Sequence, residues 1–173
     1  MKYIIPMIIL SLVLLSCSKE EEESTTTDPF SCTGSSSGSG PTIGGVTLEE
    51  ATYKSGTNSF AFVNSTSANI ALSGGTPLCY TIDVTSTTAS ILKTKSANTG
   101  NATLGGVSLS GYDNVTAYYT TVKAGTWAST PTTYHMYIYA DTDSTFYINT
   151  FGFRTKAQSD AYFYMRDSAY TKQ

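Results

Sequence analysis

The stretch that decides the fold is Leu78-Cys79-Tyr80-Thr81-Ile82-Asp83-Val84. Its residues alternate, so that one face of an extended chain carries Leu, Tyr, Ile and Val while the other carries Cys, Thr and Asp. A period of two is typical of a β-strand with one face buried. We therefore predict a strand here, and this period extends to other parts of the chain.

Further segments rich in Tyr, Thr, Ile and Phe suit the half-buried face of a sheet. The predicted strands lie around Phe60 and Phe62, and at Val115–Val122, Thr133–Ala140, Ser144–Phe151 and Ala161–Met165. Short helical turns are predicted only near Leu48–Ala51 and Lys156–Ala161. Short strands separated by Gly- and Asp-containing turns predict an all-β domain over residues 42–173. We expect an antiparallel β-sandwich of about seven to nine strands, or alternatively a small β-barrel.

The chain contains one short internal sequence similarity. The segment Thr42-Ile43-Gly44-Gly45-Val46-Thr47-Leu48 resembles Thr103-Leu104-Gly105-Gly106-Val107-Ser108-Leu109. A duplicated half-domain explains the match, and so do two unrelated Gly-Gly bends that lead into strands. The similarity ends after these residues, which favours the unrelated bends.

Composition excludes several classes of function. The chain has 173 residues, only 13% of them charged, and a formal net charge of -3. A mildly acidic chain lacks the basic surface that binds nucleic acid. One His and three Cys leave almost nothing for a metal cage or a His-based catalytic relay. We therefore predict a protein without cofactor or nucleic-acid partner that is not an enzyme.

The N-terminus predicts export. Met1 and Lys2 precede an apolar run, from Ile4 to Leu15, that is too short to cross a bilayer and is typical of a signal peptide. The run ends in Leu14-Leu15-Ser16-Cys17, which resembles the lipobox of bacterial lipoproteins. The resemblance implies that residues 1–16 are removed and that Cys17 carries the lipid anchor, which is then the protein's contact with the membrane. An ordinary secretory signal with an incidental Cys is the alternative.

Residues 17–41 are predicted to form a flexible tether, because they are rich in Ser, Thr and Gly. Ser18, in the sorting position after the lipidated Cys, resembles outer-membrane rather than inner-membrane lipoproteins. The run Lys19-Glu20-Glu21-Glu22-Glu23 resembles acidic signals that send lipoproteins to the cell surface. These resemblances imply an outer-membrane lipoprotein that faces the exterior. The periplasmic face is the alternative, and the acidic run is then only a solvated spacer.

Lipidation of Cys17 leaves Cys32 and Cys79, an even pair in an exported chain. We predict that they form a disulfide that fastens the end of the tether to the sheet. Two free thiols are the alternative.

Candidate binding residues are aromatic. Trp127, Tyr137 and Tyr139 are the predicted ligand contacts, and alternation also predicts exposed rings at Tyr162 and Tyr164. Flat rings beside hydroxyl and amide groups suit sugar binding, although Tyr is also an ordinary cross-strand partner.

Two further motifs have simpler interpretations. His135, the sole histidine, is predicted to be a solvent-facing strand residue, because no local motif supplies a nucleophile. Asp141 and Asp143 have the spacing of calcium ligands, but the rest of a calcium loop is missing, so a polar hairpin turn is the simpler interpretation.

The sequence therefore predicts a lipid-anchored binding or adhesion module for a glycan or a protein. A structural subunit of an envelope or surface assembly is the alternative.

Overall fold

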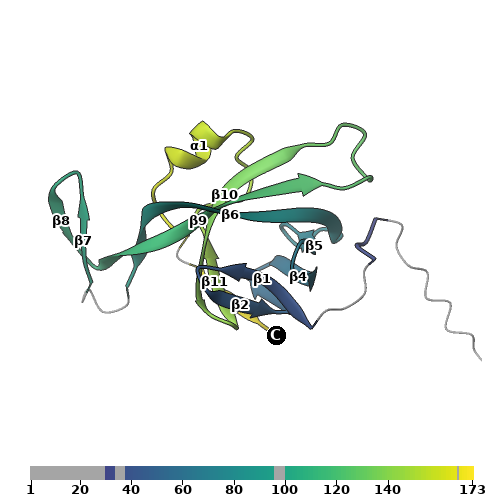
Figure 1. The fold of residues 1–173 in the computed structure, drawn as a ribbon, viewed down its shortest axis with the longest axis horizontal. Helices are drawn as coiled ribbons and strands as arrows, with labels where there is room; N and C mark the ends of the chain where they lie inside the picture. The colour runs from purple at the N-terminus through teal and green to yellow at the C-terminus, as the bar shows by residue number, and fades with distance from the viewer. Residues whose placement is uncertain (1–29, 34–37, 96–99, 167) are drawn as a thin grey trace, which may run out of the picture.

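The computed structural model describes residues 30–33, 38–95, 100–166 and 168–173 (Figure 1). Strands dominate the described chain, and one short helix, α1 (Lys156–Asp160), follows the last long strands. In chain order the strands are β1 (Ser39–Ile43), β2 (Val46–Glu49), β3 (Thr52–Ser55), β4 (Asn58–Asn64), β5 (Ser67–Ala71), β6 (Leu78–Thr94), β7 (Asn101–Leu104), β8 (Val107–Ser110), β9 (Tyr112–Ala124), β10 (Thr133–Thr142), β11 (Thr145–Ile148) and β12 (Tyr170–Lys172).

Eight strands form a closed barrel in the order β10-β11-β12-β3-β4-β5-β6-β9, and every neighbouring pair is antiparallel. The predicted all-β antiparallel fold is confirmed, and of the two predicted architectures the chain adopts the barrel rather than the sandwich. Closure depends on β12, whose Thr171 pairs with Thr145 of β11 and with Lys54 of β3. A strand this short leaves little periodic signal, which is why alternation alone did not separate a barrel from a sandwich.

Buried aliphatic and aromatic side chains fill the barrel interior. Phe60 is fully buried, and its ring lies 5.6 Å from that of Phe146 and 5.1 Å from that of Tyr170, both nearly perpendicular to it. Edge-to-face contacts of this kind are favourable for aromatic pairs. Eight strands enclose just enough space for such a core. The alternation in β6 is confirmed, since Tyr80 and Ile82 are buried in this core.

The two Gly-Gly segments are both tight hairpins. β1–β2 turns at Gly44 and Gly45, β7–β8 turns at Gly105 and Gly106, and all four glycines have positive φ. A two-residue turn of this type needs positive φ at both central residues, so glycine suits it. Gly44 has a second constraint, because a Cβ there would lie 2.5 Å from the Tyr118 ring.

The two hairpins differ in their surroundings. β1–β2 lies against the barrel and contributes Ile43 and Leu48 to the core. β7–β8 forms a separate two-stranded sheet at the end of an arm, which consists of residues 88–94 of β6 and 112–118 of β9 (Figure 1). The arm extends past the point where β9 stops pairing with β10, at Tyr118.

A second, smaller core lies outside the barrel, between the arm and the C-terminal segment. Ile91 and Ala117 from the arm pack with Tyr137 of β10 and with Met165. α1 adjoins this cluster and begins with a capping box. The Thr155 side chain accepts from the backbone N–H of Gln158, and the Gln158 side chain accepts from the backbone N–H of Thr155.

Local predictions had mixed outcomes. The short helix near Lys156 is confirmed as α1, whereas residues 48–51 end a strand and bend without forming a helix. The predicted strand Ala161–Met165 is wrong, because only Tyr164 forms a bridge, to Leu92. The reason is that the segment follows α1 and runs beside β6 for only a few residues.

The N-terminal connection is fixed by a disulfide between Cys32 and Cys79, whose Cα atoms are 4.7 Å apart. The Cys32 amide donates to the Asn69 side chain, and the Cys79 amide donates to the Phe30 carbonyl. Part of the segment predicted as a flexible tether is structured, since Cys32 is disulfide-bonded and β1 begins at Ser39. Residues 1–29, which contain Cys17 and the acidic run, lie outside the described residues.

Candidate functional site: an aromatic groove beside the arm

The largest of the three pockets described here is a groove of about 500 Å³ where the arm meets the C-terminal segment. We call it the aromatic groove, and it is lined by Thr94, Tyr112, Tyr162, Tyr164, Met165, Arg166 and Ser168. Three tyrosines and one arginine therefore share one open depression.

Backbone pairing with Leu92 places these residues. The Leu92 amide donates to the Phe163 carbonyl at 2.9 Å, and the Met165 amide donates to the Leu92 carbonyl at 2.8 Å. The C-terminal segment is thereby held beside β6, and the ring of Tyr164 comes to 6.1 Å from that of Tyr112, the first residue of β9. Residues far apart in sequence meet here because β6, β9 and the C-terminal segment run side by side.

The rings of the C-terminal segment are unusually open to solvent. Tyr162, Phe163 and Tyr164 expose 40%, 38% and 37% of their surface. They also support one another, since the Tyr164 ring lies 4.8 Å from that of Phe163 and 6.5 Å from that of Tyr162. Contiguous exposed apolar surface often marks a binding site in a soluble domain.

The hydroxyl groups of the groove tyrosines have no partner among the described residues. No hydrogen bond there involves the hydroxyls of Tyr112, Tyr162 or Tyr164, whereas those of Tyr53 and Tyr139 donate to protein oxygens. Outside the groove, the hydroxyls that likewise have no hydrogen bond among the described residues are those of Tyr80, Tyr118, Tyr134 and Tyr147. Unsatisfied hydroxyls beside exposed rings offer both stacking and hydrogen bonding to a ligand. No carboxylate lines the groove in the described part of the chain.

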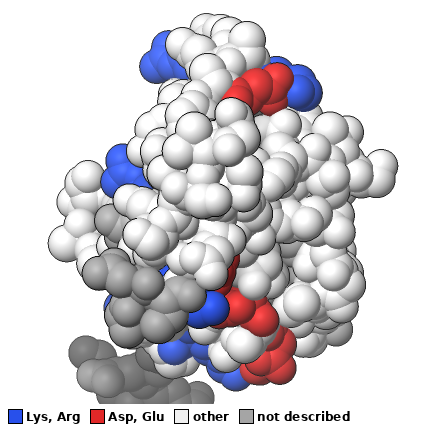
Figure 2. Space-filling model, turned by 90° about the vertical axis from the view of Figure 1, so that its left-hand side faces the viewer, with Lys and Arg blue, Asp and Glu red and all other residues white. Residues whose placement is uncertain are grey.

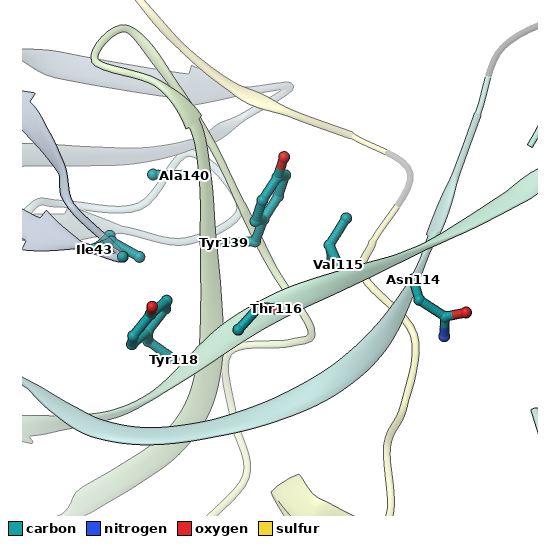
Figure 3. A pocket seen from close by; sticks show the side chains of 8 residues that line it. Ile43, Asn114, Val115, Thr116, Tyr118, Tyr139 and Ala140 are labelled. Atoms are coloured by element: carbon teal, nitrogen blue, oxygen red, sulfur yellow. The ribbon is translucent and has the colours of Figure 1, made fainter. Parts of the chain in front are cut away.

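A smaller pocket of about 320 Å³ lies between the tip of β1–β2 and the arm (Figure 3). The rings of Tyr118 and Tyr139 stand on its walls, while the Asn114 side chain points away from the other labelled residues (Figure 3). Asn114 accepts from the Thr103 amide and so ties β7 to the arm. The Tyr139 hydroxyl donates to Asp141. Its pKa is raised mainly by burial and also by this hydrogen bond. Asn114 and Tyr139 are thus engaged within the protein, whereas the Tyr118 hydroxyl has no hydrogen bond among the described residues.

The structure does not bring the three predicted contacts together. Trp127 packs on Tyr80 and its indole N–H donates to the Cys79 carbonyl at 2.7 Å, near the disulfide. Tyr137 exposes only 3% of its surface, contrary to the exposure that alternation predicted. Tyr139 lines the small pocket, so none of the three contributes to the aromatic groove.

Tyr137 belongs to a polar cluster that holds α1 against β10. Its hydroxyl donates to Asp160, which also accepts from Lys156 at 2.7 Å. Burial raises the pKa of Tyr137, and the hydrogen bond from Lys156 lowers that of Asp160. His135 is half-buried and hydrogen-bonds Tyr119 instead of standing free in solvent.

The predicted calcium residues form a turn. The Asp141 carboxylate accepts from Tyr139, and the Asp143 backbone carbonyl accepts from the buried Tyr53 hydroxyl at 2.6 Å. Among the described residues, no three His, Cys, Asp or Glu side chains gather where they could hold a metal ion.

The face at the arm end of the molecule carries little charge (Figure 2). Most of its described surface is neither acidic nor basic, and the charged side chains lie mainly towards its upper and lower parts. A face with so few charged side chains produces only a weak long-range electrostatic field.

In the described part of the chain, no helix has the length and apolar character needed to cross a membrane. Comparison with protein-family models, with curated proteins and with solved structures gives no match to this chain.

Proposed function

We propose that the protein is a lipid-anchored outer-membrane lipoprotein, exposed on the cell surface, whose barrel binds glycan at the aromatic groove without catalysing a reaction. The observation that carries the binding part is the pair of exposed tyrosines, Tyr162 and Tyr164, beside the half-buried Tyr112, with hydroxyls that have no hydrogen bond within the described residues. Sugar rings have apolar faces and hydroxyl edges, so stacked aromatic rings and polar neighbours suit both.

Glycan binding is expected to weaken about tenfold or more when Tyr164 is replaced by alanine, because central exposed aromatics dominate many binding sites. Binding of the detergent-solubilised full-length protein to a glycan array, followed by titration calorimetry with the strongest ligand, measures this. Tyr139→Ala is the matched control, since it removes a tyrosine of the small pocket. Loss of binding in Tyr139→Ala but not in Tyr164→Ala would move the site to the small pocket.

The localisation part rests on the lipobox resemblance at Leu14–Cys17 and on the acidic run after it. Cys17→Ala is expected to leave the protein unlipidated and to release it from membranes, as measured by fractionation. Protease added to intact cells is expected to cleave the unmodified protein. Unchanged membrane retention of Cys17→Ala would rule out this anchor, and full protection from protease would place the protein on the periplasmic side.

A structural subunit is the second candidate, and the arm is the observation that favours it. Val107 at the tip of β7–β8 exposes 62% of its surface, and exposed edges and apolar tips can pair with another chain. Concentration-dependent light scattering of the full-length protein, without any glycan ligand, would favour this function over glycan binding.

A further inference from the structure

The aromatic groove contains one charged group among its described lining residues, the guanidinium of Arg166. Arg166 also lines a neighbouring pocket of about 170 Å³, together with Asn58 and Tyr170. The side chain therefore stands between two adjoining depressions. A ligand longer than a single sugar unit would pass this residue.

The position of Arg166 is fixed by its backbone. Its amide donates to the Ile148 carbonyl of β11 at 3.0 Å, one residue after Met165 bonds to Leu92. The segment is thus fastened to two different barrel strands, β6 and β11, and the backbone of Arg166 is held in place.

The charge of Arg166 is not neutralised by the described protein. The three ion pairs of the described residues are Lys95–Asp113, Lys156–Asp160 and Lys172–Glu49, and none includes Arg166. Asp113, which follows Tyr112 of the groove, is already paired with Lys95 at 3.2 Å. Asp167 lies outside the described residues. Arg166 therefore supplies an unshared positive charge to a groove whose described lining has no acid.

We propose that the aromatic groove selects sugars that bear a carboxylate, with Arg166 donating two parallel N–H bonds to it while Tyr112 and Tyr164 contact the sugar ring. This inference rests on the proposed function of the groove. The planar guanidinium fork matches the two carboxylate oxygens, a geometry that Lys does not reproduce. Residues 42–173 contain eight acidic and eight basic side chains, so the domain has no net charge to attract anions in general, and selectivity comes from this one contact.

The test uses ligand pairs that differ only in charge. Oligogalacturonate and a sialylated oligosaccharide are each compared with their methyl esters, by titration against the full-length protein. We expect each acid to bind about tenfold more tightly than its ester, the strength of one charge-assisted contact at an exposed site. Because an exposed ion pair is screened, the preference is expected to shrink as salt is raised.

Variants separate the inference from the proposed function. Arg166→Gln is expected to abolish the preference for acid over ester, and Arg166→Lys to keep only part of it. Arg154→Gln is the matched control, since Arg154 is an exposed arginine outside the groove. Equal binding of acid and ester, still lost in Tyr164→Ala, would overturn the role of Arg166 and leave the glycan site standing. Failure of every acidic and neutral glycan to bind would overturn both.

Discussion

Replacing Phe60 by alanine is expected to lower the free energy of unfolding by about 4 kcal/mol, since deletion of a buried Phe side chain typically costs about 3–5 kcal/mol. Phe60 is fully buried, and its ring contacts those of Phe62, Phe146, Phe151 and Tyr170. The change removes the partner of all four rings and leaves a cavity that a closed sheet cannot easily collapse. Urea unfolding followed by near-ultraviolet circular dichroism measures the loss.

The matched control for this prediction is Val107→Ala. Val107 exposes 62% of its surface, so its truncation is expected to change the free energy of unfolding by less than about 0.5 kcal/mol. If Phe60→Ala unfolds at the same urea concentration as the unmodified protein, the ring cluster is not the core of the domain.

Removal of the disulfide, by Cys32→Ser together with Cys79→Ser, is expected to cost about 4 kcal/mol. The two residues are 47 positions apart, and the chain-entropy model gives about this value for a loop of that length. The cross-link restricts the unfolded chain more than the folded one, because the Cys32 amide also bonds to Asn69 and holds the segment in the folded state. Thermal unfolding, monitored by circular dichroism, measures the difference.

A reducing agent provides the control for the disulfide. It is expected to lower the unfolding temperature of the unmodified protein to that of the double variant and to leave the double variant unchanged. An unmodified protein that is indifferent to the reducing agent, with both thiols free to alkylation, would show that the pair is not linked.

The barrel strands β4, β6, β9, β10 and β11 were predictable because each has one face in the core, whereas β3, β5 and β12 were not among the predicted strands. Tyr80 and Ile82 are buried while Thr81 and Asp83 are exposed, as the alternation from Leu78 to Val84 predicted. The remainder of β6 was not predictable from alternation, because in the arm both faces meet mixed surroundings. Ile91 packs in the small core, but Leu92 is buried too, although it lies on the same face as the exposed Thr88 and Ser90.

Exposure on the outer face of the barrel was harder to predict. Alternation correctly separates Tyr137 from Met136 and Ile138, which point into the barrel. It cannot show that Met165 and Asp160, which follow much later in the chain, cover Tyr137. Non-local packing, rather than local periodicity, decides which of these rings is exposed to solvent.

The candidate site was predictable only in part for the same reason. Tyr162 and Tyr164 were expected to be exposed, and they are, but Phe163 is exposed as well because the predicted strand does not form. Tyr112 and Arg166 carried no local signal, because they join the groove only when the C-terminal segment pairs with Leu92. The repeated Gly-Gly hairpins show the converse, since equal local sequence gave equal turns but opposite burial of Ile43 and Leu104.

The disulfide also determines how the protein carries mechanical load. Under the proposed function, tension between the N-terminal segment and a ligand in the aromatic groove would enter the domain at Cys32 and cross the covalent bond to Cys79, at the start of β6. It would then run along β6 to Leu92, which is bonded to the C-terminal segment of the groove. Residues 33–78, including β1–β2 and three barrel strands, lie in a closed loop outside this path. When the molecule is pulled, residues 33–78 therefore carry no tension. The force acts on β6, which is hydrogen-bonded to β9.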